Sequence, residues 1–120
     1  MGRERRRFDR LPVSLEVEIT DLESFETEEA VLSNLGPAGA FVSSRVLMPR
    51  QGRVVLDFRL DPNDPKSEIS LIARVLWHRM GLRGDGHGFG CQFDQVSRKD
   101  QAAIHEFVLG QRTHGKEFVL

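Results

Sequence analysis

Five arginines lie within the first ten residues and are the side chains best suited to binding a ligand. They are Arg3, Arg5, Arg6, Arg7 and Arg10, and no lysine lies among them. A guanidinium group grips phosphate oxygens at two points and stacks on flat rings, whereas a solubilising tail has no reason to prefer arginine. Because Leu11 and Pro12 join this arm directly to a strand-like segment, the arginines stay close to the folded surface. Their chemistry suits a ligand with phosphates and planar rings.

A second candidate lies at Asn34-Leu-Gly-Pro-Ala-Gly39, which contains two glycines and a proline. A turn between two strands explains these residues by itself, because Asn and Gly tolerate a positive φ. The same residues also suit a binding loop. Glycines let a ligand approach the backbone, and Asn offers both a donor and an acceptor to the edge of a base. The residues alone leave both interpretations open.

The other reactive side chains form no catalytic or metal-binding pattern. None of His78, His87, His105 and His114 has metal-ligand spacing to another His or Cys. Cys91 falls among positions that face the expected core, where we expect a buried and inert thiol. No Gly-Lys-Ser/Thr sequence marks a P-loop. We therefore expect no enzymatic activity, no metal and no cofactor.

Alternation of apolar and polar residues with a period of two predicts strands. They are expected at residues 14–20, 26–33, 40–43, 53–60, 68–78 and 89–93. One helix should begin at the N-cap Ser97, place Ile104, Phe107 and Val108 on one face, and stop at Gly110. This order predicts a mainly β fold, a small six-stranded antiparallel β-barrel with a C-terminal helix covering one open end.

The inward-facing side chains of the expected barrel follow from the same alternation. The face of the longest strand should carry Ile69, Leu71, Ala73, Val75 and Trp77. The predicted interior comprises Leu15, Val17, Ile19, Val54, Leu56, Phe58, Leu71, Ala73, Val75, Phe89, Cys91 and Phe93.

The length and composition indicate one globular domain. The chain has 120 residues, 39% of them hydrophobic and 29% charged, with a formal net charge of −1. We divide it into an Arg-rich arm at residues 1–12, a barrel with its helix at 13–110 and a tail at 111–120. A lone cysteine is compatible with a reducing compartment, and no apolar run approaches the roughly 18 residues of a membrane span. We expect a cytoplasmic protein without membrane insertion.

Several segments together resemble one family. Arg6-Arg7-Phe8-Asp9-Arg10 resembles the RxxxR arm of PilZ domains, and Asn34 to Gly39 resembles their second motif, (D/N)xSxxG. Ala73-Arg-Val-Leu-Trp77 and Gly88-Phe-Gly-Cys-Gln-Phe93 are similar to later strands of the family. Both motifs stand in order, with the closing strand and helix behind them, so the resemblance covers residues 5–110.

The resemblance implies a bacterial receptor that binds cyclic di-GMP, changes conformation and so regulates an unidentified effector protein. Arg6 and Arg10, beside Arg5 and Arg7, would hold the phosphates and guanines of the ligand, and the arm would close over it. Asn34 would bond a guanine edge and Gly39 would leave room for the ligand. Gly36 departs from the motif's serine, and the missing hydroxyl should weaken binding on the order of tenfold, for a bond of about 1 kcal/mol.

Two other interpretations compete with this one. A degenerate PilZ-like adaptor would act through protein–protein contacts without binding the nucleotide, and both Gly36 and the acidic face of the first strand favour it. A nucleic-acid-binding barrel would use the arginines on phosphates. Residues 16–29 carry seven acids and no base, however, and would repel a long polyanion. We therefore expect no DNA or RNA partner, and a monomer or weak dimer.

Overall fold

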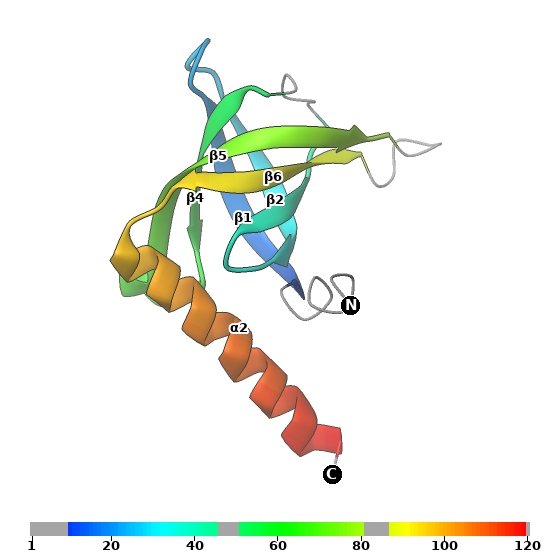
Figure 1. Cartoon of the computed structure of the whole chain (residues 1–120), viewed down its shortest axis with the longest axis vertical. Coiled ribbons are helices and arrows are strands. Elements are labelled where there is room, and N and C mark those ends of the chain that lie inside the picture. Colours follow the sequence, from blue (N-terminus) through cyan, green and yellow to red (C-terminus); the bar gives the residue numbers. More distant parts are fainter. Residues whose placement is uncertain (1–9, 46–50, 81–86, 120) are drawn as a thin grey trace.

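The computed structural model describes residues 10–45, 51–80 and 87–119, with side chains described as far as Gly110. Figure 1 shows a β-barrel from which one helix leads away. The strands are β1 (Leu11–Asp21), β2 (Thr27–Leu35), β3 (Gly39–Ser43), β4 (Arg53–Arg59), β5 (Glu68–Arg79) and β6 (Gly88–Gln95). A single 3-10 turn, η1 (Pro65–Ser67), precedes β5, and the helix is α2 (Arg98–Val119).

The six strands close into a barrel in the order β1-β2-β3-β6-β5-β4. Every neighbouring pair is antiparallel, and the pairing of β1 with β4 completes the ring. Closure pairs the backbone groups that an open sheet would expose at its edges. The expected six-stranded antiparallel barrel with a C-terminal helix is confirmed.

The barrel interior consists of the inward-facing residues of all six strands. Eleven of the twelve predicted interior residues are buried, and the twelfth, Phe93, is half-buried and packs against the others. The alternation of apolar and polar residues predicts which side chains face the interior, because successive side chains of a strand point to opposite faces. The core forms where those faces meet.

Trp77 is the exception among the residues expected to face inward. Ile69, Leu71, Ala73 and Val75 are buried, but Trp77 is 45% exposed. The register between β5 and β6 shifts between Val75 and Trp77, so β5 holds an extra residue there. An extra residue in one strand reverses the alternation beyond it. The expectation for Trp77 was wrong for that reason, and the indole lies on the outer surface.

The helix α2 begins where the sequence predicts. Ser97 Oγ accepts a hydrogen bond from Asp100 N at 3.1 Å, which satisfies a backbone donor of the first turn. Ile104 and Val108 are buried in the barrel core, and Phe107 packs against it half-buried. The helical stripe therefore fastens the start of α2 to the barrel.

The predicted end of the helix at Gly110 was wrong, because α2 continues to Val119. A glycine costs a helix about 1 kcal/mol relative to alanine but keeps its backbone donor, and no proline follows it. Figure 1 shows the later turns of α2 leading away from the barrel. The division of the chain at residues 12 and 110 stays a prediction, and α2 crosses the second position. No helix in the described residues is long and apolar enough to cross a bilayer.

Candidate ligand-binding site

The glycine-rich motif at residues 34–39 forms a tight connection between β2 and β3. Asn34 lies within β2 and Gly39 begins β3, so only residues 36–38 lie between the strands. Gly36 N donates to Gly39 O at 2.9 Å, with Pro37 and Ala38 at the two central positions of the turn. Proline suits the first central position because its φ is already set. The motif was expected to interrupt the strands, but its first and last residues extend them.

The side-chain oxygen of Asn34 in β2 links this strand to β3 and to Arg10. Its Oδ1 accepts hydrogen bonds from Phe41 N at 2.8 Å and from Arg10 Nη1 at 2.8 Å. Two donors converge on this atom, so it must be the oxygen of the amide, and both of its lone pairs are used. The register between β2 and β3 shifts between Leu32 and Asn34, and the amide oxygen bonds the β3 backbone at this irregularity.

Gly39 allows two other groups to come close to the β3 backbone. A Cβ at this position would lie 2.4 Å from Cys91 O and 3.0 Å from Arg10 Nη2. The first of these atoms is backbone of β6 and cannot move aside. Glycine is therefore required by the pairing of β3 with β6, and it also leaves space for the guanidinium of Arg10. That guanidinium lies in part of the space beside Gly39 that we had assigned to the ligand.

Cys91 lies beneath this arrangement, and its thiol is buried. Burial raises the pKa of its thiol from 9.0 to about 12, while the nearby positive charge of Arg10 acts in the opposite direction. The Sγ atom donates to Ala40 O at 3.5 Å. A thiol that stays protonated at neutral pH is neither a nucleophile nor a metal ligand. The expected burial of this cysteine is confirmed, and its raised pKa supports the expectation of an inert thiol.

An aromatic pair lies beside Arg10 and Asn34 on the outer surface of the barrel. Phe41 and Trp77 stack with their ring centroids 5.4 Å apart and an interplanar angle of 27°. The Arg79 guanidinium lies 4.4 Å from the centroid of the Phe41 ring, in a cation–π contact. Phe41 is buried under this cover without belonging to the barrel core.

Cross-strand register places these residues in one row, which we call the outer row. Pro12 is paired with Asn34, Asn34 with Phe41, Phe41 with Gly90 and Gly90 with Trp77. Arg10 lies at the β1 end of the outer row through its bond to Asn34. The row therefore presents a guanidinium, an amide and a stacked aromatic pair on one face of the barrel.

The spacing of two glycines in β6 is a sequence signal for the aromatic pair, and we had used these glycines only for the family resemblance. Gly88 and Gly90 stand two residues apart and so face the same side of β6. A Cβ on Gly88 would lie 2.2 Å from Val42 O and 2.7 Å from the Phe41 ring, and one on Gly90 would lie 2.2 Å from the Trp77 ring. Glycine within a strand often marks a place where another group approaches the backbone closely, as the two rings do here.

The structure thus brings together Arg10, Asn34, Gly36 and Gly39 from the two predicted motifs. Of the remaining predicted site residues, Arg5, Arg6 and Arg7 lie outside the described residues. Within the described part of the chain, no group of His, Cys, Asp and Glu side chains could hold a metal ion.

Known proteins share the fold described above. A family model described as PilZ domain matches residues 4–110. The structure is similar to that of the Bacillus subtilis inhibitor of motility (MotI/DgrA), with a TM-score of 0.74 and 17% identity. That match covers 88% of this chain but only 50% of the other, so the chain spans half the length of that protein.

Two isolated PilZ domains are matched over nearly their whole length. The PilZ domain of CeSA from a cellulose-synthesizing bacterium has a TM-score of 0.60 and 21% identity, covering 86% of this chain and 97% of that one. The PilZ domain of YcgR from Escherichia coli, solved with c-di-GMP, has a TM-score of 0.65 and 13% identity, covering 92% and 93%. At these identities the likeness concerns the fold. No curated protein sequence matches the chain.

Proposed function

Because the chain belongs to the PilZ domain family, we propose that it is a receptor for cyclic di-GMP that regulates a partner protein and catalyses no reaction. The observation that carries the proposal is the bond between Arg10 and Asn34 above Gly39. Arg10 and Asn34 belong to different family motifs and are 24 residues apart in sequence, and this contact brings the two motifs together.

Arg10 is positioned to bind a phosphate of the ligand. A guanidinium presents its N–H donors in one plane, a geometry that matches two oxygens of a phosphate. The bond to Asn34 orients that plane across the start of β3, and Arg10 is exposed to solvent. Arg6 and Arg10 are the two arginines of the RxxxR motif. We propose that Arg6 binds the second phosphate, with Arg5 and Arg7 beside it.

The aromatic pair offers a stacking surface for one guanine. The indole of Trp77 is half-exposed, stacks on the Phe41 ring and lies close to Gly90 of β6. Stacking of a base on an aromatic side chain is worth about 1–3 kcal/mol. A purine on Trp77 would lie in the outer row that begins at Arg10, so the phosphates and one base could be held together.

A receptor of this kind suits the cytoplasm of a bacterium, where we place it. The lone, buried Cys91 fits a reducing compartment. We further propose that it acts as a monomer or weak dimer and binds neither DNA nor RNA. Its downstream effector is a separate protein that recognises the ligand-bound form.

Titration calorimetry with cyclic di-GMP tests the proposal on the whole chain. Loss of one charge-assisted contact in Arg6→Ala should weaken binding about ten- to a hundredfold or more. Arg10→Lys should also weaken it, because lysine keeps the charge but loses the planar fork. Arg98→Ala, which removes an exposed arginine at the start of α2, is the matched control and should bind as the wild type does.

Gly36→Ser restores the hydroxyl of the family motif and should tighten binding on the order of tenfold. No heat from the wild type at high ligand concentration, together with rescue by Gly36→Ser, would establish the degenerate adaptor instead. Chromatography of the ligand after long incubation should recover intact cyclic di-GMP. If the wild type binds and both Arg6→Ala and Arg10→Lys bind equally well, the assigned site is wrong.

A further inference from the structure

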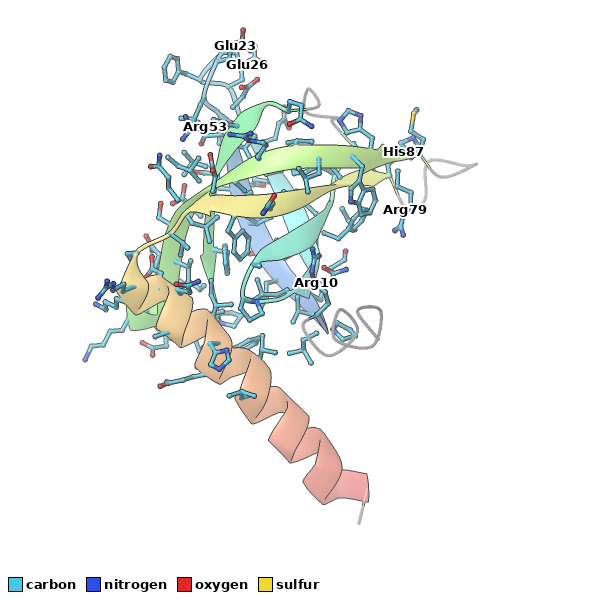
Figure 2. All side chains as sticks on the ribbon, viewed as in Figure 1. Arg10, Glu23, Glu26, Arg53, Arg79 and His87 are labelled. Carbon is cyan, nitrogen blue, oxygen red and sulfur yellow. The ribbon has the colours of Figure 1, made fainter. Side chains whose placement is uncertain are left out.

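The connection between β1 and β2 forms a hairpin tip at the far end of β1 from Arg10. Phe25 N donates to Asp21 O at 2.7 Å, and Asp21 N donates to Glu26 O at 2.9 Å, which closes the loop. Figure 2 shows Glu23 and Glu26 at this tip, remote from Arg10. The eleven residues of β1 separate the two places by about 33 Å at the usual rise of a strand.

Phe25 is not explained by the fold of this tip. Its side chain is 73% exposed, so it adds little to any core. Its φ is 63°, in the left-handed region that is unfavourable for a residue with a Cβ. Glycine or asparagine would form the same turn with less strain. A large aromatic side chain is therefore held out into solvent at a position where the backbone favours a small residue.

The hairpin residues around Phe25 are acidic, although Arg53 of β4 lies next to the tip, where its carbonyl accepts a hydrogen bond from Leu22 N at 3.1 Å (Figure 2). Glu23 and Glu26 flank it, both exposed, and residues 16–29 contain no Lys, Arg or His. Further down the hairpin, Glu18 stands directly opposite Glu29 on β2 and directly opposite Asp57 on β4. Like charges in direct cross-strand register are destabilising. In the described part of the chain, these three carboxylates form no ion pair that would relieve the repulsion.

We propose that the β1–β2 tip is the docking site for a partner protein that presents an apolar pocket with a basic rim. Phe25 is the anchor that enters the pocket, and the carboxylates of Glu23 and Glu26 meet the rim. Buried aromatic anchors contribute most of the binding energy in protein interfaces, and complementary charge speeds association. A second copy of this chain is a poorer occupant, because two acidic tips would repel each other.

This docking site does not depend on nucleotide binding, since it uses neither the arginine arm nor the outer row. A photoreactive p-benzoylphenylalanine at position 25, expressed in the native bacterial host, should cross-link one protein on illumination. The same group at the exposed Glu106 on α2 is the positional control and should not cross-link that protein. The captured protein is then purified, and its affinity for the wild-type chain is measured at low and at high salt.

Phe25→Asn should weaken that affinity at least tenfold, while Phe25→Tyr, which keeps an aromatic ring, should restore most of it. Glu23→Lys with Glu26→Lys should weaken binding and remove its salt dependence, whereas the control Glu106→Lys should change neither. All these variants should bind cyclic di-GMP as the wild type does. Calorimetry with the nucleotide therefore distinguishes a failure of the proposed function from a failure of the docking site. Phe25→Asn should also melt at the same or a higher temperature than the wild type.

Four results would overturn the proposal. They are no cross-link at position 25, a cross-link only to a second copy or to the chain's own arm, full affinity in Phe25→Asn, and a lower melting temperature in that variant. The last result would show that the aromatic side chain serves the hairpin itself.

Discussion

Arg10 Nη1 donates to Asn34 Oδ1 at 2.8 Å, and this contact joins the residue before β1 to the penultimate residue of β2. Because the same oxygen also accepts the backbone N–H of Phe41, the orientation of Arg10 is tied to the pairing of β2 with β3. A change at Asn34 should therefore affect both the barrel and the proposed ligand site.

Asn34→Ala should destabilise the protein by about 1–3 kcal/mol, because the partly buried Phe41 N–H loses its acceptor. Asn34→Asp keeps an acceptor at that place and adds a negative charge opposite Arg10, so it should recover most of the loss. Urea denaturation monitored by circular dichroism measures both effects. An unchanged midpoint in Asn34→Ala would mean that water replaces the side chain at no cost.

Gly39→Ala and Gly110→Ala should shift stability in opposite directions. At Gly39 a methyl group meets the Cys91 carbonyl at 2.4 Å, so β3 and β6 must separate, at about 1–3 kcal/mol. At Gly110 nothing lies within 4 Å of the added group, and alanine in a helix is favoured by about 0.5–1 kcal/mol. Thermal melting of the two variants beside the wild type makes the comparison, and equal midpoints would contradict it.

The contact between α2 and the barrel should depend most on Ile104. This side chain is fully buried, so Ile104→Ala should cost about 2–5 kcal/mol. From the sequence, Phe107→Ala would cost about 3–5 kcal/mol if the ring were fully buried. The ring is only half-buried, and the expected loss is correspondingly smaller. Chemical denaturation should rank Ile104→Ala below Phe107→Ala in stability.

Alkaline pH should destabilise the protein through Cys91. Burial raises the pKa of the thiol from 9.0 to about 12 in the folded state, so the folded chain holds this proton more tightly than the unfolded chain. The resulting stability is fully present below pH 9 and is lost as the pH rises toward 12. Replacing the thiol in Cys91→Ala should flatten this part of the stability profile. The native thiol should also resist alkylation at pH 8 and react readily in urea.

Trp77 is the single tryptophan of the chain and so reports on the outer row without labelling. If a guanine of cyclic di-GMP stacks on it, its fluorescence should be quenched in proportion to the bound fraction measured by calorimetry. Trp77→Ala should weaken binding by about ten- to a hundredfold, for a stacking contribution of 1–3 kcal/mol. Binding without any change in fluorescence would place the base elsewhere.

Local patterns were sufficient for the strands, the core and the start of the helix. Leu15, Val17 and Ile19 face inward because a strand alternates its side chains, whatever its neighbours are. Ser97 caps α2 because its hydroxyl lies within reach of a backbone N–H three residues later. The arginine arm and the loop at residues 34–39 could also be chosen as ligand-binding segments from side-chain chemistry alone.

The sequence by itself determined which segments form strands and which side chains could bind a phosphate. Only the tertiary structure decided that Trp77 faces outward, that Asn34 holds Arg10, and that the carbonyl of Cys91 requires glycine at position 39. Each of these depends on where an extra residue enters one strand or how near a second strand passes. Both depend on how two strands pair, so the alternation of residues within a single strand cannot predict them.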